Sequence, residues 1–221
     1  ITRQVAIKRV LPSLTQHENF IRMFVDEARL SMQLTHANIV QVFDVGRSSG
    51  SYYIVMEFVE GYDLRRVFQR ASEKGIRIPL EVACFLITEV CLGLAYAHEK
   101  KDAAGRHLRI VHRDLSPGNV LVSKSGEVKI TDFGLAKAIT QSDITDPGIV
   151  KGKFAYLSPE AAQGREVDHR ADIFAAAICL WELLSQRRLF MGKNDNETVE
   201  MVKATEIPPL SKFHDGVTPQ F

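Results

Sequence analysis

Residues 111–119 read VHRDLSPGN, and thirteen positions after the last of them the chain begins the triplet DFG at residues 132–134. Between these stretches, residues 120–122 and 128–130 are short apolar runs on either side of a Ser-Gly pair, which predicts a small β-hairpin. One short motif would be weak evidence. Two acidic motifs in this order, joined by a hairpin, are hard to obtain by chance, so the rest of the sequence is interpreted outward from them.

The composition is that of one globular unit with a well-filled core: 221 residues, 45% hydrophobic and 25% charged. The chain has 28 Lys and Arg residues and 27 Asp and Glu residues, which gives a net charge of +1. This balance does not indicate a protein that binds nucleic acid, since such proteins are usually strongly basic. The basic cluster within residues 100–109 is interrupted by DAAG at 102–105 and is interpreted as a solvated loop.

No apolar run approaches the roughly 18 residues that cross a bilayer, and no signal peptide is recognised. We therefore expect a cytoplasmic domain, with any membrane tether outside these residues. Cys84, Cys91 and Cys179 suit a reducing compartment and are predicted to be buried free thiols.

Strands are predicted at the front of the chain and helices behind them, which indicates an α+β arrangement with a hinge near residues 58–63. The predicted strands are 1–10, 39–45 and 52–58, and the predicted helices are 17–34, a short one near 63, 80–98, 172–184 and 198–204.

The helix at 17–34 carries a charge inside an apolar stripe. Phe20, Phe24, Glu27, Leu30 and Leu34 share one face by their spacing. A carboxylate on a core-facing stripe is costly unless it meets a cation. We therefore expect a basic partner for Glu27.

The residues quoted so far resemble the eukaryotic-like (Hanks-type) protein kinases. Lys8 follows Val-Ala-Ile on a strand as the kinase strand lysine does, and SPE at 158–160 stands where kinases have Ala-Pro-Glu. RDLSPGN at 113–119 and KGKFAYLSPE at 151–160 look most like bacterial members. The resemblance runs from about Val5 to Leu189 and implies a two-lobed fold, with a small antiparallel-sheet N-lobe and a mainly helical C-lobe.

The resemblance implies a role for each polar residue of the motifs. Asp114 is the candidate catalytic base, Asn119 and Asp132 are the candidate Mg²⁺ ligands, and Lys8 binds ATP phosphates while paired with Glu27. The alternative for the Asp and Asn residues is loop capping, which explains each of them singly but not their order. Asp172 matches a buried aspartate that holds the catalytic loop backbone.

Weaker correspondences outline an adenosine pocket. Met56 would lie behind the adenine, backbone groups of Glu57 and Val59 would bind it, and Asp63 would contact the ribose. Ala6 and Leu121 would enclose the ring. Each apolar member of this set could equally be plain core.

The chain also departs from the kinase pattern. Only seven residues precede Lys8, so the Gly-rich loop and first strands that kinases carry there are not in the sequence. We therefore expect residues 1–221 to be a kinase catalytic domain truncated at both ends, with residues 1–59 from the N-lobe and 60–221 from the C-lobe.

Two substitutions affect the predicted site. Kinases usually carry Lys where Ser116 stands and Thr where Lys153 stands. We hypothesise an exchange in which Lys153 supplies the positive charge and Ser116 the hydroxyl. The alternative is that Lys153 points to solvent and the enzyme is slow.

Regulation by phosphorylation is predicted from Arg113, a cation that can meet a phosphate on the loop after residue 134. Thr140, Ser142 and Thr145 are the available hydroxyls. Alternatively, Arg113 pairs with a carboxylate of the same loop.

The sequence thus predicts a serine/threonine protein kinase that uses ATP and Mg²⁺ and acts on protein hydroxyls, tyrosine being the less favoured acceptor. The alternative is a pseudokinase that serves as a nucleotide-binding or partner-binding module without transfer.

Overall fold

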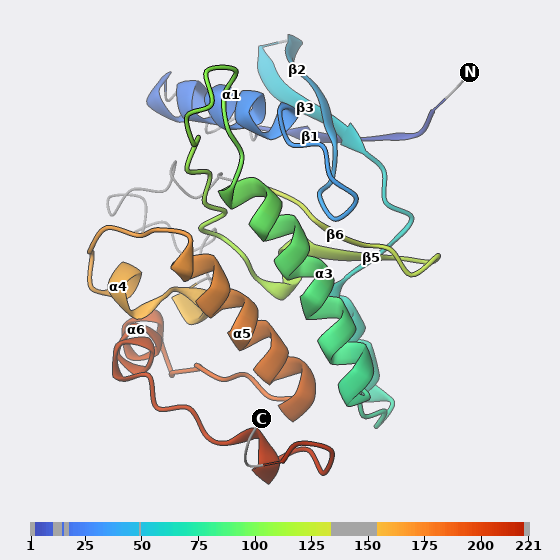
Figure 1. Cartoon of the computed structure of the whole chain (residues 1–221), viewed down its shortest axis with the longest axis vertical. Helices are drawn as coiled ribbons and strands as arrows, with labels where there is room; N and C mark the ends of the chain where they lie inside the picture. The colour runs from blue at the N-terminus through green and yellow to red at the C-terminus, as the bar shows by residue number, and fades with distance from the viewer. Residues whose placement is uncertain (1–2, 11–14, 16–17, 49, 134–153, 219–221) are drawn as a thin grey trace.

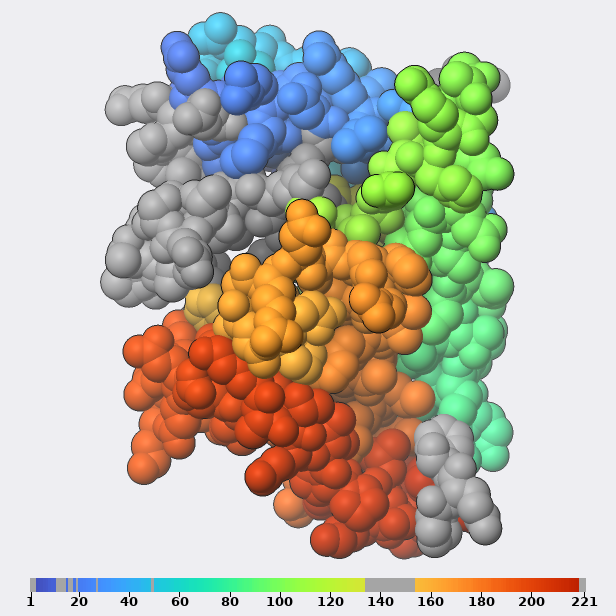
Figure 2. Space-filling model, turned by 60° about the vertical axis from the view of Figure 1, so that its left-hand side comes forward, coloured from blue at the N-terminus to red at the C-terminus, as the bar shows by residue number. Residues whose placement is uncertain are grey.

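The structure of the chain is a computed structural model that describes residues 3–10, 15, 18–48, 50–133 and 154–218, without the side chains of Asn19 and Glu27. Figure 1 shows a small sheet with one helix at the upper end and a larger helical part below it. Figure 2 shows the described residues near the start of the chain, in blue, at one end of the molecule and those near its end, in red, at the other. The predicted two-lobed α+β fold is therefore confirmed.

The upper part is an antiparallel sheet covered by one helix. Strands β1 (Val5–Arg9), β2 (Val42–Ser48) and β3 (Ser51–Glu57) lie in the order β1-β3-β2. Helix α1 (Glu18–Met32) packs on the sheet through a small core of Val10, Phe24, Ala28 and Ile54. Because side chains alternate along a strand, Ala6 and Lys8 of β1 point to the same face.

The lower part begins with a second sheet of order β4-β5-β6. Its strands are β4 (Gly61–Asp63), β5 (Val120–Ser123) and β6 (Val128–Ile130). The sequence predicts the β5–β6 hairpin but not β4, which is only three residues long and pairs with β5 from far away along the chain. The helices that follow are α2 (Leu64–Glu73), α3 (Leu80–His98), α4 (Pro159–Ala162), α5 (Arg170–Ser185) and α6 (Asp195–Ala204), with short 3₁₀ turns at 117–119, 154–156 and 210–212.

Helices α3 and α5 form the centre of the lower part, and they lie side by side in Figure 1. Leu80–Glu99 is long and apolar enough to cross a membrane by length and composition, although the sequence analysis found no such run. Packing accounts for part of this apolar character, since 39% of the window is buried inside the molecule. Seven residues of α3, spaced as one helical stripe, are buried in the core against α5 and β6.

Two predictions about burial are wrong. Leu30 is 40% exposed and does not share the buried face of Phe24 and Leu34. Cys91 is exposed, and only Cys179 of the three free cysteines is buried. Cys91 follows the buried Val90 directly, and one residue turns a helix by about 100°, which takes its side chain off the buried stripe.

A short backbone connection fixes the upper part to the lower one. The Val40 amide donates to the Ile130 carbonyl, and the Ile130 amide donates to the Asn38 carbonyl, each at 2.8 Å. The segment after α1 is therefore tied to the end of β6, two residues before Asp132. This connection places Asp132 beneath the upper sheet.

Candidate active site

The loop that carries Asp114 is held from below by α5. Asp172, which is 1% exposed, accepts hydrogen bonds from the His112 amide and the Arg113 amide, each at 2.8 Å. Arg113 has a φ of 64°, a left-handed conformation that costs a non-glycine residue about 1–2 kcal/mol. The two hydrogen bonds offset that cost. The contact expected of Asp172 is therefore confirmed.

His98, which the sequence analysis did not single out, completes the environment of Asp172. Its Nε2 lies 2.7 Å from Asp172 Oδ2, and it comes from the last turn of α3. The signal in the sequence was weak, since a single histidine near a helix end is common. Only the packing of α3 against α5 brings these two residues together.

His112 connects the catalytic loop to the segment after β6. Its ring is fully buried, its Nδ1 accepts from the Asp114 amide at 3.2 Å, and its Nε2 lies 3.0 Å from the Thr131 carbonyl. A carbonyl can only accept, so Nε2 carries the proton in this tautomer. The ring also lies 4.6 Å from that of Phe133. Thus one side chain fixes the loop of Asp114 relative to Asp132.

Asn119 fixes the orientation of Asp114 and keeps its own oxygen available. Its Nδ2 donates to the Asp114 carbonyl at 2.7 Å and to Asp114 Oδ2 at 3.2 Å. Because the carbonyl can only accept, the amide nitrogen must face Asp114. The Oδ1 atom of Asn119 is thereby turned away from Asp114, as a metal ligand would need to be.

Lys8 and Asp132 meet across the boundary of the two parts. Lys8 Nζ lies 2.6 Å from Asp132 Oδ1, and the two side chains are 38% and 23% exposed. Asp132 has a φ of 64°, so its backbone turns sharply after β6. The structure thus brings Lys8 to Asp132 and Asn119 to Asp114, while the catalytic roles of the four residues stay predictions.

The residues proposed for the adenosine pocket lie at the junction of the two sheets. Ala6 is opposite Met56 in the β1–β3 register, and Leu121 is opposite Asp63 in the β4–β5 register. Asp63 also caps α2, because its Oδ1 accepts from the Arg66 amide at 2.9 Å. Val59 lies between the two sheets along the chain.

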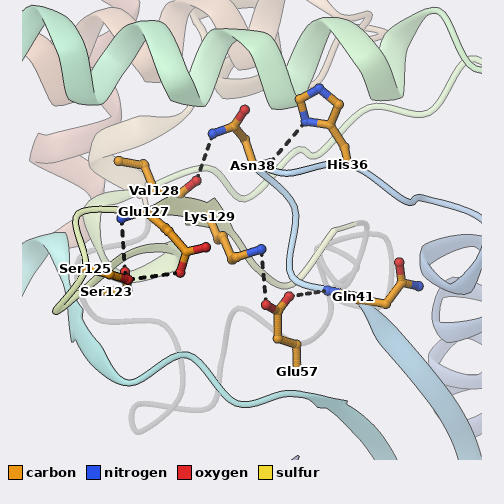
Figure 3. Close-up of polar contacts among 9 residues, drawn as sticks. All are labelled: His36, Asn38, Gln41, Glu57, Ser123, Ser125, Glu127, Val128 and Lys129. Carbon is orange, nitrogen blue, oxygen red and sulfur yellow. Dashed lines mark hydrogen bonds and ion pairs between the residues drawn. The ribbon is translucent and has the colours of Figure 1, made fainter.

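Glu57, at the end of β3, is anchored by a contact that the sequence did not indicate. Its Oε1 lies 3.1 Å from Nζ of Lys129, a lysine that is only 8% exposed, and its Oε2 accepts from the Gln41 amide at 3.2 Å. Figure 3 shows both contacts of the Glu57 carboxylate. The one with Lys129 ties the end of β3 to β6 of the lower sheet, and the one with Gln41 ties it to the residue before β2.

The donor set fits Mg²⁺. The carboxylate of Asp132 and the amide oxygen of Asn119 are hard oxygen donors, and Mg²⁺ in phosphate-transfer sites uses few protein ligands and keeps waters. Among the described residues no group of three His, Cys, Asp or Glu side chains could hold a metal ion. An ion held by these two oxygen donors would keep coordination positions for nucleotide phosphates and water.

Several predicted site residues cannot be placed. The side chain of Glu27 and the whole of Lys153, Thr140, Ser142 and Thr145 lie outside the described residues. Ser116 is described and is 7% exposed, and its carbonyl accepts from the Asn119 amide at 2.9 Å. The exchange of roles between Ser116 and Lys153 stays a prediction.

Comparisons with known proteins agree with this geometry. A family model described as "Protein kinase domain" matches residues 1–217. The chain is 44% identical over 207 residues to a protein named tyrosine-protein kinase MasK of Myxococcus xanthus, covering 94% of this chain. It is 38% identical over 217 residues to serine/threonine-protein kinase PrkC of Bacillus subtilis, covering 98% of this chain. The chain spans 32% of the length of each of these relatives.

A solved structure is similar as well. The crystal structure of a mutant form of the Mycobacterium tuberculosis PknI kinase domain matches with a TM-score of 0.68 and 26% identity, covering 96% of this chain and 70% of that chain. The match of fold, motif geometry and family model shows that this chain belongs to the protein kinase domain family.

Proposed function

We propose that this chain is the catalytic domain of a serine/threonine protein kinase that transfers the γ-phosphoryl group of ATP to protein hydroxyls with Mg²⁺. The observations that support the proposal are the two pairs Lys8–Asp132 and Asn119–Asp114, which are linked by the Thr131 amide donating to the Asn119 carbonyl at 2.9 Å. We assign residues 1–59 to the N-lobe and 60–221 to the C-lobe of this domain.

Each of these side chains has a separate task. Lys8 binds phosphate oxygens, with Glu27 as its expected partner on α1. Asp114 accepts a hydrogen bond from the acceptor hydroxyl and takes its proton. Asn119 holds the carbonyl and carboxylate of Asp114 in place. Mg²⁺, held by Asn119 and Asp132, would supply positive charge against the phosphates.

The adenosine pocket is proposed from the register of the two sheets. Ala6 is on β1 of the upper sheet, where Met56 of β3 is its partner, and Leu121 is on β5 of the lower sheet, where Asp63 is its partner. The Glu57 amide donates to the Gln41 carbonyl at 2.8 Å, so the backbone group of Glu57 that remains for adenine is its carbonyl. Val59 and Asp63 would bind adenine and ribose respectively.

Two observations support serine or threonine as the residue that accepts the phosphate. PrkC and the Mycobacterium tuberculosis PknL, which is 35% identical to this chain, are named serine/threonine kinases. The catalytic loop also lacks the arginine that tyrosine kinases typically show there. Tyrosine is the second candidate because MasK, at 44% identity, is named a tyrosine kinase. Phosphoamino-acid analysis of the product separates the two.

Regulation is proposed to follow from phosphorylation of Thr140, Ser142 or Thr145, with Arg113 as the cation that receives the phosphate. We place the domain in the cytoplasm, where ATP is available, with any membrane tether outside these residues. Mass spectrometry of the active protein tests the first statement, since full activity with an unphosphorylated loop would exclude it.

The decisive experiment is phosphate transfer from labelled ATP by the full-length protein to a mixed set of Ser, Thr and Tyr peptides. An Asp114→Asn variant is the control, because it keeps the size of the side chain but cannot accept the proton. Transfer by the wild type and none by the variant supports the kinase. Nucleotide binding without transfer would favour the pseudokinase, and equal incorporation by both proteins would show that Asp114 is not the catalytic base.

A further inference from the structure

Arg65, in the first turn of α2, lies directly against the catalytic loop. A Cβ atom added to Gly118 would come within 2.8 Å of Arg65 Nη2 and 3.3 Å of its Cζ. The backbone of Gly118 does not need glycine for its conformation, since its φ is not positive. The missing side chain instead leaves the space that the guanidinium occupies.

This position is close to the proposed catalytic base. Gly118 is followed by Asn119, whose Nδ2 lies 2.7 Å from the Asp114 carbonyl. The guanidinium of Arg65 is thus one residue away from the side chain that orients Asp114. Arg65 therefore lies beside the loop to which a substrate hydroxyl would be brought.

Arg65 is exposed and, among the residues that the structure describes, has neither an ion-pair partner nor a ring to lie over, whereas Arg66 and Arg70 of α2 each have one such contact. The Arg66 guanidinium lies over the ring of Tyr62 at 4.8 Å, and Arg70 pairs with Glu73 at 3.1 Å. The carboxylate of Asp63 caps the helix by accepting from the Arg66 amide. The charge of Arg65 is therefore available to a ligand.

The charge of Arg65 affects the pKa of one buried carboxylate, that of Glu182, and the oxygens of Glu182 already have other partners. Glu182 is 3% exposed and accepts from the Tyr156 hydroxyl at 2.7 Å and the Leu189 amide at 3.0 Å, with Arg188 Nε at 3.5 Å. Burial raises the pKa of Glu182, and the charges of Arg188 and, more weakly, Arg65 oppose that rise. Glu182 thus neither neutralises Arg65 nor offers a free anion to a substrate.

We propose that Arg65 is a specificity-determining residue that binds an Asp or Glu side chain of the protein substrate beside its acceptor hydroxyl. The proposal rests on the kinase function argued above and names its substrate class. An extended peptide advances about 3.3 Å per residue, so three positions on either side of the acceptor cover about 10 Å, and we expect the acidic residue within that span. A guanidinium suits this task because it matches a carboxylate with two parallel hydrogen bonds.

The test uses peptides with a single Ser or Thr acceptor in a neutral background, with Glu, Gln or Lys placed singly at each of the three positions on either side. Both kcat/KM for transfer and Kd from fluorescence anisotropy are measured on the full-length protein. For the wild type we expect Glu to be favoured over Gln about three- to tenfold at one position, in both measurements. The preference should weaken as salt is added.

The variants then assign the preference to one side chain. Arg65→Gln should remove it, and Arg65→Glu should transfer it to the Lys peptide at the same position. Arg66→Ala is the matched control, since Arg66 is the next residue of α2 and faces Tyr62; the preference should persist. No preference in the wild type, a preference that survives in Arg65→Gln, or an equal loss in Arg66→Ala would each overturn the proposal.

The binding measurement separates this proposal from the kinase function. If no peptide is phosphorylated but the Glu preference in Kd depends on Arg65, the kinase function fails and the acidic site stands. If peptides are phosphorylated with equal efficiency whatever their charge, the acidic site fails and the kinase function stands.

Discussion

Lys8 Nζ and Asp132 Oδ1 lie 2.6 Å apart, although Lys8 comes from a strand of the upper sheet and Asp132 follows a strand of the lower sheet. The pair thus spans the boundary between the two parts of the molecule. Both side chains remain partly exposed, so the pair stays accessible to phosphate and metal. An ion pair of this exposure contributes little to stability, about 0–1 kcal/mol, which points to a role in binding rather than folding.

We expect Lys8→Met to lower kcat/KM for phosphate transfer by about 10²–10³-fold, because a preorganised positive charge against the phosphates is lost. The free energy of unfolding should change by less than about 1 kcal/mol. Steady-state kinetics and urea denaturation measure the two effects. Lys124→Met is the matched control, since it removes the exposed Lys124–Glu60 pair away from the site and should leave the kinetics unchanged.

We expect Asn119→Ala to raise the Mg²⁺ concentration needed for half-maximal activity by about tenfold or more, because an oxygen ligand is lost. Asp114→Asn should lower the rate about 10²–10⁴-fold while leaving that Mg²⁺ concentration unchanged, because only the proton acceptor is removed. Mg²⁺ titrations at saturating ATP distinguish the two variants. An Asn119→Ala enzyme with an unaltered Mg²⁺ requirement would contradict the ligand assignment.

We expect Asp172→Ala to destabilise the fold by about 3–5 kcal/mol, because it removes the acceptor of two backbone amides and the partner of His98 in a buried site. Urea denaturation measures the loss. Asp168→Ala is the control, because its carboxylate pairs with Arg170 at the surface and its removal should cost much less than that of Asp172. Similar losses in both variants would show that the buried hydrogen bonds are not the cause.

The pH dependence of stability should carry a contribution from Glu182, whose pKa burial raises above its ordinary value of 4.5. A carboxyl with a raised folded-state pKa stabilises the fold fully below its unfolded-state pKa and loses that contribution as pH rises through the folded-state pKa. Glu182→Gln cannot ionise. The free energy of unfolding of the wild type should therefore fall relative to Glu182→Gln as pH rises above about 4.5. Urea denaturation of both proteins across that range tests the sign, and a relative gain by the wild type would refute it.

The exchange between Ser116 and Lys153 is tested by a double-mutant cycle. If Lys153 supplies the charge usually carried at position 116, Lys153→Thr should slow transfer, and adding Ser116→Lys should restore part of the rate. We expect a coupling energy of about 1 kcal/mol or more from the four values of kcat/KM. Additive losses would mean that the two residues act independently.

The sequence predicted most helices and strands because their periodicity and their turn residues are local signals. It failed where long-range packing decides. Strand β4 has three residues and exists only because it pairs with β5. Leu30 and Cys91 match the apolar pattern of their helices, yet each faces solvent because no other described element covers that side. The buried Lys129 beside Glu57 has no signal in the chain, since burial of a lysine depends on a partner brought from elsewhere.

The sequence by itself determined the family and predicted which side chains would form the site, because the lysine, the asparagine and the two aspartates stand in motifs whose order and spacing are specific. The tertiary structure decided how those groups face one another. Two backbone amides of the loop at residues 112–113 donate hydrogen bonds to Asp172. Lys8 forms an ion pair with Asp132, and Arg65 occupies the space beside Gly118. Each of these contacts joins residues far apart in the chain, and the forces that bring them together are the packing of helices and the pairing of strands, which no local pattern encodes.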